Sequence, residues 1–281
     1  MKITLDFNKS VDENASSYFE KAKKSRKKLV GTKTTLEKFQ NEKANEKIET
    51  NTKKLTKLEN KNSLWFDKFK WFVSSDGYLI IAGRDATTNE IIIKKHTETK
   101  DLVFHTDMAG SPFAIIKFDS KDVKLINDKL KVPKFETIPE QTIKETAAFV
   151  ALHSRSWKLG LGNAKVFYVS PEQVSKEANP GEFMAKGSFM IRGKTNYVSY
   201  DFEFGIGVFF EKVICGPLNA IQTHSKKVVQ ILQGNDKASE VARKIKSTFR
   251  EKENLDLSPD DIIKTLPSGG CEVKKERIKK Y

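Results

Sequence analysis

The sequence predicts an α+β fold, a mostly antiparallel mixed sheet with packed helices, preceded by a charged helical or coiled-coil arm. Strands and helices mix without the regular strand–helix–strand rhythm of a parallel α/β protein. An apolar, aromatic stretch at 65–85 alternates like a hairpin. Residues 1–63 hold 16 Lys and Arg against 9 Asp and Glu, with few apolar positions. These patterns indicate an arm at 1–62, a domain at 63–214 and a small strand–helix–helix extension at 215–281.

Composition restricts the class of protein. A length of 281 residues permits a real core, and a net charge of +14 favours polyanionic partners, nucleic acid first and an anionic membrane surface second. A lysine-rich proteome is the alternative cause of this charge. The start resembles no signal peptide, and no stretch approaches the roughly 20 apolar residues of a membrane span. We therefore expect a cytoplasmic protein without membrane contact.

The two cysteines, Cys215 and Cys271, are isolated from each other and from any second pair of metal ligands. This spacing favours free thiols in a reducing compartment and argues against a zinc site. We expect no metal and no cofactor.

In the arm, residues 15–28 are nearly all strong helix formers, and residues 34–61 resume a helical spacing after Gly31. This pattern is typical of a solvated helix or a short two-helix coiled coil. Such an arm either aids solubility or acts as a lever that touches RNA or a ribosomal surface.

The hairpin is the most apolar part of the chain. Phe69, Trp71 and Val73 alternate along the first strand, residues 75–77 form a turn, and residues 78–82 suit an interior strand. Asp85 then caps a predicted helix that ends with Lys94 and Lys95, where cations suit the helix dipole.

The remaining elements follow from local periodicity and turn residues. The predicted strands are 101–105, 113–118, 165–170, 188–192, 197–204, 206–210 and 226–233, with a break at the glycines 205–207. The predicted helices are 139–157, a short one from 171, 237–250 and 259–265. The predicted irregular segments are a surface excursion at 120–133, turns at 179–182 and 266–270, and a basic tail.

Two stretches carry the best binding candidates. At 83–85, Arg84 can meet a phosphate while Asp85 caps the helix and its backbone NH groups help to hold the anion, or Arg84 pairs with Asp107 or another carboxylate. At 186–196, polar and apolar residues alternate, lysines flank the strand, and glycines let a nucleic-acid backbone approach. An ordinary amphipathic strand with solvated charges is the alternative for this second stretch.

The predicted RNA-binding residues are Arg84, Lys94, Lys95, Arg155, Lys158, Lys186, Ser188, Arg192, Lys194 and Asn196. Asp85, His105 and Asp107 are predicted as structural or additional site positions. His105 and Asp107 lie near Ser111, but the chain has no nucleophile elbow and too few carboxylates there for a nuclease-like metal site. A structural role in the turn before Gly110 is the simpler interpretation, so we expect no enzymatic activity.

Three segments resemble a known family: WFDKFKWFVSSDGYLIIAGRD at 65–85, HTDMAGSPFAIIK at 105–117, and VFYVSPEQVSKEANPGEFMAKGSFMIRGKTNYV at 166–198. Together they look like the NFACT-R domain, the RNA-binding module of the NFACT proteins. The resemblance covers roughly residues 62–210, and ALHSRSW at 151–157 also fits. Residues 5–28 resemble the start of the family's coiled coil, and residues 266–270 are similar to the end of archaeal members.

The resemblance implies a role in ribosome-associated quality control. NFACT proteins bind a large ribosomal subunit that still carries peptidyl-tRNA, and recruit tRNA so that a tail is added without mRNA. The family's functional Asp-Arg pair lies in an amino-terminal domain to which nothing here corresponds, and the pair Arg84–Asp85 is not that motif. The hypothesis is that this chain is the carboxyl half of a split NFACT protein, with a separate polypeptide supplying the amino half.

The sequence therefore predicts a non-enzymatic protein that binds tRNA on a stalled large ribosomal subunit. The alternatives are a free-standing DNA or RNA adaptor without ribosome specificity, a scaffold whose coiled coil recruits proteins and, last, a metal-dependent enzyme. The oligomeric state is open at this point.

Overall fold

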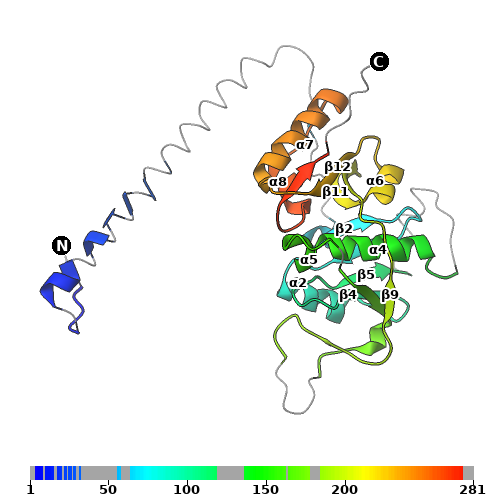
Figure 1. Ribbon diagram of the computed structural model, residues 1–281, viewed down its shortest axis with the longest axis horizontal. Helices are drawn as coiled ribbons and strands as arrows, with labels where there is room; N and C mark the ends of the chain where they lie inside the picture. Colours follow the sequence, from blue (N-terminus) through cyan, green and yellow to red (C-terminus); the bar gives the residue numbers. More distant parts are fainter. Residues whose placement is uncertain are drawn as a thin grey trace. The chain divides into compact units, whose positions relative to one another are not determined.

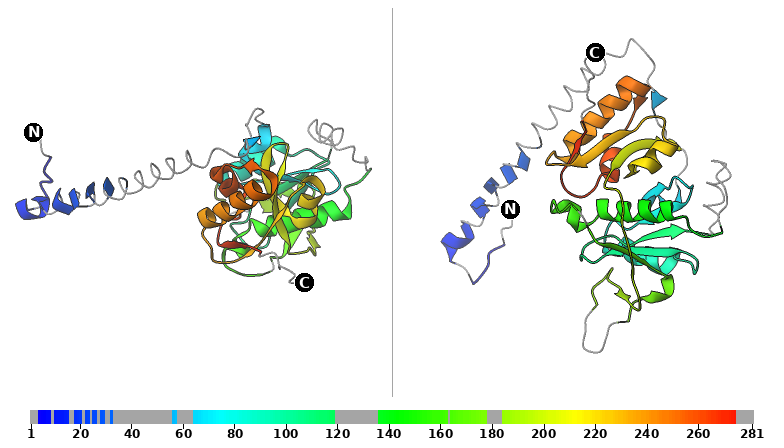
Figure 2. Two further views of the ribbon diagram at one scale, coloured as in Figure 1. Left: turned by 90° about the horizontal axis from the view of Figure 1, so that it is seen from above. Right: turned by 45° about the vertical axis from the view of Figure 1, so that its right-hand side comes forward.

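The computed structural model describes residues 4–8, 10–15, 18–20, 22–23, 25–26, 28–29, 32, 56–57, 64–118, 136–162, 164–177 and 184–274 (Figures 1 and 2). The chain divides into one unit at Met1–Lys54 and another at Leu55–Tyr281. In the first unit, residues 11–15 and 18–20 are helical, in agreement with the predicted arm helix. Four predictions lie outside the described residues: most of the helix at 34–61, the excursion at 120–133, the turn at 179–182 and the tail from 275.

The prediction of a helix at 34–61 is wrong at the two residues of this range that the structure describes. Thr56–Lys57 form a two-residue strand, β1, which pairs in parallel with β13 (Leu255–Asp256). The β-branched Thr56 suits extended backbone, and pairing with β13 gives the backbone polar groups partners that a solvated arm lacks.

The α+β prediction and the predicted hairpin are both confirmed. Strands β2 (Lys70–Val73) and β3 (Leu79–Ala82) pair antiparallel, and Gly77 takes a φ of 87° in the turn between them. They begin a six-stranded antiparallel sheet in the order β2-β3-β5-β4-β6-β9. Its other strands are β4 (Leu102–Thr106), β5 (Ala114–Lys117), β6 (Val166–Val169) and β9 (Asn196–Val198).

The hairpin is covered on both faces. Val73 and Ile81 belong to one buried cluster, whereas Phe72 and Ile80 belong to another on the opposite face. Because successive strand residues point to opposite sides, the continuous apolar run of β3 requires cover on both sides of the sheet. The hairpin is therefore central to the core.

Helix α4 (Glu140–Leu152) provides much of that cover (Figure 1). Ala147 and Val150 pack with the six-stranded sheet, while Ala148 and Leu152 pack with a second, four-stranded sheet. A helix between two sheets must be apolar on several faces, and its alanines permit close approach. The predicted helix at 139–157 is interrupted at Ser154, whose hydroxyl donates to the Ala151 carbonyl at 2.7 Å, and α5 (Arg155–Lys158) follows.

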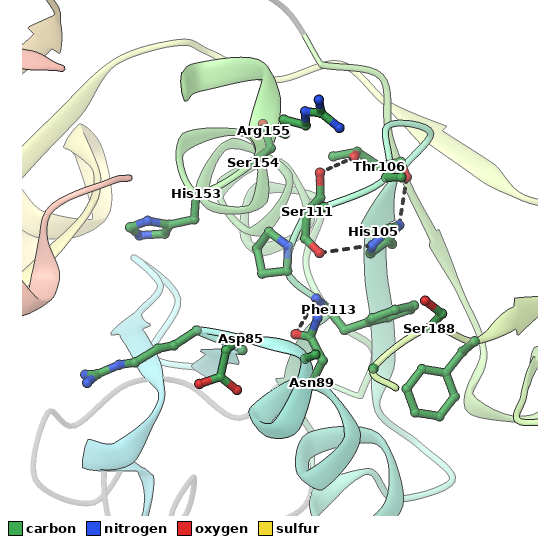
Figure 3. Close-up of a pocket in the computed structure, with 18 of the residues that line it drawn as sticks. Asp85, Asn89, His105, Thr106, Ser111, Phe113, His153, Ser154, Arg155 and Ser188 are labelled. Atoms are coloured by element: carbon green, nitrogen blue, oxygen red, sulfur yellow. Dashed lines mark hydrogen bonds between the residues drawn. The ribbon is translucent and has the colours of Figure 1, made fainter. Parts of the chain in front are cut away.

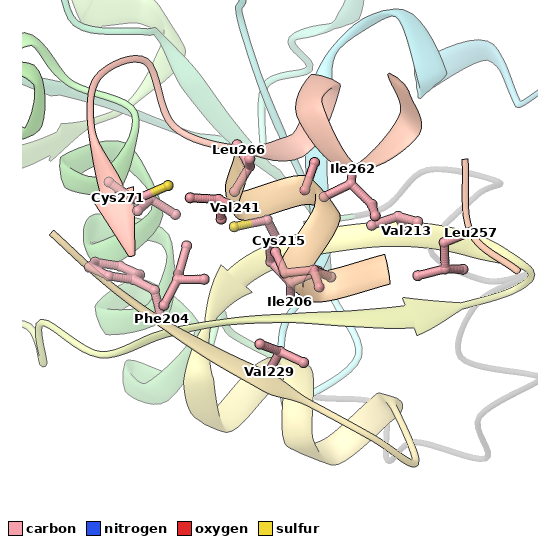
Figure 4. Close-up of a cluster of buried hydrophobic side chains, with 14 of the residues drawn as sticks. Phe204, Ile206, Val213, Cys215, Val229, Val241, Leu257, Ile262, Leu266 and Cys271 are labelled. Carbon is pink, nitrogen blue, oxygen red and sulfur yellow. The ribbon is translucent and has the colours of Figure 1, made fainter. Parts of the chain in front are cut away.

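The second sheet is antiparallel and has the order β11-β10-β12-β14 (Figure 4). Its strands are β10 (Phe204–Phe209), β11 (Lys212–Pro217), β12 (Val229–Gln233) and β14 (Cys271–Val273). Helices α6 (Leu218–His224), α7 (Ala238–Glu253) and α8 (Pro259–Thr265) accompany it, and the last two were predicted. The boundary predicted between residues 214 and 215 falls inside β11, so the small extension shares a sheet with 204–214.

The predicted strand break at Gly205–Gly207 is wrong, because β10 runs through both glycines. A Cβ atom at Gly205 would lie 2.6 Å from Val228 Cγ1, and one at Gly207 would lie 2.5 Å from Ser225 Oγ. Because the two glycines have no side chain, the segment between α6 and β12 can pack directly against β10, and the strand continues through both positions. The chain instead leaves the six-stranded sheet after Val198 and enters the other sheet at Phe204.

Short elements complete the described fold. They are η1 (Trp65–Lys68), α2 (Ala86–Ile91), the π-turn η2 (Ile92–His96), η3 (Pro171–Gln173), β7 (Val174–Ser175) and β8 (Met190–Ile191). The predicted strand at 188–192 is thus reduced to two residues that pair with β7. Among the described helices, none has the length and apolar content that crossing a bilayer requires.

Candidate nucleic-acid interface

A pocket of about 890 Å³ opens where segments distant in sequence meet (Figure 3). Its walls come from the start of α2, the loop after β4, the start of α5, residues 186–191 and Ser268 of the carboxyl-terminal loop. Five cationic side chains line it, against the two carboxylates of Asp85 and Asp107. The five cations are those of Lys70, Arg84, Arg155, Lys158 and Lys186. Such an excess of positive charge in a concave site attracts anions.

The pocket gathers many of the residues that the sequence predicted for a site. Those that line it are Arg84, Asp85, His105, Asp107, Arg155, Lys158, Lys186 and Ser188. The predicted residues that do not line it are Lys94, Lys95, Arg192, Lys194 and Asn196. Sequence reasoning missed Lys70, Asn89, His153 and Phe189. Only the position of Lys70 within an otherwise apolar strand could have drawn attention to it.

Gly187 places Lys186 and Ser188 at the pocket. Its φ is 77°, and a Cβ atom there would lie 2.5 Å from Ala86 Cα. Residues 186–188 can therefore lie directly against the start of α2 only because this position is glycine. The sequence predicts that this glycine lets a nucleic-acid backbone approach closely. In the structure the backbone that lies against Gly187 is that of Ala86, in the protein itself.

Arg84 and Asp85 divide the roles that the sequence predicted. Arg84 Nη2 donates to the carbonyl oxygens of Asp67 at 3.2 Å and Phe69 at 3.0 Å, so its described partners are backbone groups and not Asp107. Asp85 caps α2 as predicted, accepting from the Thr88 amide at 2.8 Å. This hydrogen bond is the first cause of the lowered pKa of Asp85. The sequence predicts that backbone NH groups at the start of α2 help to hold an external anion. In the structure the Thr88 NH group instead binds the carboxylate of Asp85.

His105 and Asp107 brace the loop after β4. The ring nitrogens of His105 face two backbone carbonyls, with Nδ1 2.7 Å from Thr106 O and Nε2 3.2 Å from Ser111 O. The ring also stacks on Phe113 with centroids 4.2 Å apart, and burial lowers the pKa of His105. Asp107 accepts from the Tyr197 hydroxyl at 3.0 Å. These contacts fit the structural role considered for the pair.

No arrangement for a serine nucleophile follows from these contacts. His105 reaches the backbone carbonyl of Ser111, whereas the Ser111 hydroxyl lies 2.5 Å from the Thr106 hydroxyl. Within residues 64–118, 136–162, 164–177 and 184–274, no three His, Cys, Asp or Glu side chains gather closely enough to hold a metal ion.

Lys70 ties three segments together beneath the pocket. Its Nζ lies 3.0 Å from His153 Nδ1 and donates to the Leu266 carbonyl at 2.9 Å. Because a protonated lysine can only donate, His153 Nδ1 accepts and the ring proton lies on Nε2. Burial lowers the pKa of Lys70 to about 8 and that of His153 well below its usual value. The hairpin, the end of α4 and the carboxyl-terminal loop are thereby joined.

The predicted residues outside the pocket lie on two other segments. The Gln173 side-chain amide donates to the carbonyls of Arg192 at 2.8 Å and Lys194 at 2.9 Å. Arg192 Nη2 lies 3.8 Å from a carboxylate oxygen of Glu177, and its side chain is 55% exposed. Asn196 begins β9. Lys94 and Lys95 lie in the π-turn η2, away from the pocket lining, where Lys94 pairs with Glu90 at 2.7 Å.

Comparisons with known proteins bear on this site. A family model for the NFACT protein RNA binding domain matches residues 68–193. The chain is 38% identical over 236 residues to the archaeal Rqc2 homolog aRqcH of Methanocaldococcus jannaschii, covering 82% of this chain and 32% of that protein. It is 38% identical over 152 residues to the ribosome quality control complex subunit NEMF homolog of Drosophila melanogaster, covering 52% and 13%. It is 34% identical over 188 residues to ribosome quality control complex subunit NEMF of Homo sapiens, covering 66% and 16%.

The chain therefore spans at most about a third of the length of these relatives. The matched range begins in the hairpin and ends with the segment that carries Lys186 and Ser188, so it contains most of the pocket wall. The resemblance seen in the sequence is confirmed. The chain belongs to the NFACT family, and residues 68–193 match that family's RNA-binding domain.

Proposed function

We propose that this protein is an RNA-binding component of ribosome-associated quality control that binds tRNA on a stalled large ribosomal subunit. The observation that carries the proposal is the cation-rich pocket, which lies largely within the range matched by an RNA-binding family. The names of the relatives, as subunits of ribosome quality control complexes, supply the process.

Electrostatics supports a polyanionic ligand at this pocket. Within the described part of the chain, Arg155, Lys158 and Lys186 have no carboxylate within ion-pair distance. The charge of Lys186 also acts on the carboxylates of Asp85 and Glu90, whereas Arg155 and Lys158 keep their charge available for phosphate groups. The proposal is binding without catalysis, in line with the structural role considered for His105, whose ring nitrogens face backbone carbonyls.

The place of action in this proposal is the cytoplasm. The proposal also keeps the hypothesis of a companion polypeptide that supplies an NFACT amino-terminal domain. Affinity purification of the tagged protein in mild salt tests the companion, because a stable complex would bring down a chain with that domain.

Sedimentation tests the proposed function. After translation is stalled in cells, the protein should travel with large ribosomal subunits on a gradient, and purified protein should prefer tRNA to duplex DNA of equal charge. About four phosphate contacts predict a roughly 100-fold loss of affinity between 50 and 200 mM salt. Equal affinity for tRNA and DNA, together with absence from the subunit fractions, would support the free-standing adaptor instead.

A further inference from the structure

We infer that the pocket encloses one unstacked RNA nucleotide, with its phosphate at Arg155 and Lys158 and its base against Phe189. The inference rests on the proposed RNA-binding function and gives it a specific subsite. It concerns a single nucleotide because the site is concave, whereas a duplex presents only its backbone and groove edges.

The size of the pocket suits this ligand. Its volume of about 890 Å³ lies in the range of sites that enclose small molecules, roughly 300–1,000 Å³. A mononucleotide is a ligand of that class. Loops of tRNA contain bases that can leave the stack, and proteins that read single-stranded RNA bind such bases in this way.

An aromatic wall forms one side of the pocket. Phe113 is buried and held between two rings, with His105 stacked at 4.2 Å and Phe189 edge-on at 5.3 Å. Phe189 is only partly buried and lines the pocket, with Lys176 Nζ over its ring at 5.0 Å from the centroid, so a ligand can use the part of the ring that Lys176 does not cover. Pro112 and Ile191 extend this apolar surface. A base that stacks on a preformed aromatic wall gains contact without ordering the protein.

Two of the cations lie on α5, a different element from those that form this wall. Arg155 and Lys158 are exposed at the start and end of α5, and Figure 3 shows Arg155 beyond Ser111 from Phe113 and Ser188. Gly110 has a φ of 87°, which favours glycine, and the loop lies against Arg155, since a Cβ atom at Gly110 would make an ordinary contact with Arg155 Cδ at 3.6 Å. The side chain is thus supported over the loop.

The pocket combines cationic side chains with an aromatic surface, and this combination favours one class of ligand over another. An acidic peptide would use the cations, but its side chains have no planar ring to stack on Phe189. A nucleotide uses both the cations and the aromatic wall. The hydroxyl of Ser188, exposed beside Phe189, offers a hydrogen bond to a base edge.

Titration of the full chain with the four 5′-mononucleotides tests the inference. We expect millimolar binding, weaker binding of inorganic phosphate, and a loss of at least about tenfold in Arg155→Gln. Phe189→Leu, which keeps an apolar side chain, should lose about five- to tenfold for mononucleotides and leave phosphate binding unchanged. Arg243→Gln, at an exposed arginine on α7 outside the pocket lining, is the matched control and should change nothing.

Photo-crosslinking gives a readout that needs no variant. A tRNA carrying 4-thiouridine in its loops should crosslink to peptides that contain residues 184–191 or 105–113. Crosslinks only elsewhere, or mononucleotide binding unaffected by both variants while tRNA still binds, would overturn the inference and leave the proposed function standing. Loss of tRNA binding by the wild-type protein would remove the proposed function itself. An acidic peptide that binds as tightly as the mononucleotides, through Arg155 and without Phe189, would also overturn the inference.

Discussion

Two basic regions that the sequence places side by side have different surroundings in the structure. Lys186 lines the pocket together with Arg155 and Lys158, and none of the three has a carboxylate within ion-pair distance in the described part of the chain, although the charge of Lys186 acts on Asp85 and Glu90. Arg192, only six positions further on, lies near Glu177, and the Gln173 amide binds its carbonyl. Charge count does not separate the two regions. The two regions differ in whether the backbone places the cation in the pocket lining. Substitutions in each region can therefore test which of them binds RNA.

The largest effect is expected at the glycine that holds the pocket segment in place. Gly187→Ala introduces a Cβ atom 2.5 Å from Ala86 Cα at a φ of 77°, so the segment must move away from α2. We expect a loss of roughly 2–4 kcal/mol in the free energy of unfolding, measured by urea denaturation, and weaker tRNA binding.

The matched control for this variant is Gly162→Ala, since a Cβ atom at Gly162 would have nothing within 4 Å and the residue has no positive φ. Its unfolding free energy should stay within about 0.5 kcal/mol of wild type. Equal behaviour of the two variants would show that residues 186–188 do not depend on contact with α2.

Neutralising the two regions in turn tests the comparison directly. The sequence predicts that residues 186–196 are the best binding candidate and that substitution of Arg192 and Lys194 reduces RNA binding. The position of the pocket instead leads us to expect the larger effect at Arg155 and Lys158. We expect Arg155→Gln with Lys158→Gln to lower tRNA affinity about 10- to 100-fold, and Arg192→Gln with Lys194→Gln to lower it less than about threefold. Fluorescence anisotropy at fixed salt measures both, and the opposite order of losses would return the site to residues 192–196.

The pH dependence of stability sharpens the role of Lys70 beneath the pocket. Its pKa falls from 10.5 to about 8 on folding, chiefly through burial, so between these pH values the unfolded chain binds the extra proton. The contribution of Lys70 to stability should therefore rise from pH 8 to 10.5, by at most about 1.4 kcal/mol per pH unit.

The measurement is the difference in unfolding free energy between wild type and Lys70→Met across that range. Cys215 and Cys271 titrate in the opposite sense, because burial raises their pKa values to about 12 and about 11. The contribution of Cys271 is common to both proteins and cancels, whereas Lys70 also acts on the pKa of Cys215, so both variants are measured in a Cys215→Ala background. A difference that does not change with pH would mean that Lys70 keeps its proton in the folded protein.

The smallest effect is expected at the exposed helix end. Lys94→Gln breaks a pair between the exposed Lys94 and the partly buried Glu90, one helical turn apart, and Lys94 does not line the pocket. Such pairs contribute little in water. We expect no resolvable change in the denaturation midpoint and a change of less than about twofold in tRNA affinity. A loss as large as that of the Arg155 and Lys158 variant would extend the RNA surface to η2.

Local patterns predicted local elements well. The turn at 75–77, the Asp85 cap and the helices at 237–250 and 259–265 all form where propensity and capping indicate. The failures occur where distant packing decides. Gly205 and Gly207 are typical strand breakers but lie within β10, because α6 and the segment before β12 approach there. The continuous helical pattern at 139–157 is divided, since α4 ends at Leu152 and α5 begins after Ser154.

In the candidate site too, local sequence features were predictable and contacts between distant segments were not. Arg84, Asp85, His105 and Asp107 were found because charged residues at strand ends are visible in sequence. Lys70 and His153 were missed, since their proximity joins β2 to the end of α4 across 83 positions. No periodicity in a single sequence reports such a contact.

The sequence by itself determined the antiparallel α+β class, the central hairpin and the family, because alternation, capping residues and ordered motifs are local features. Tertiary structure alone decided which cations share a pocket. Gly187 against Ala86, Gly110 against Arg155 and Lys70 between His153 and Leu266 bring segments from the whole domain to one place. The physical reason is that steric fit and buried hydrogen bonds between distant segments set these positions, and neither depends on spacing along the chain.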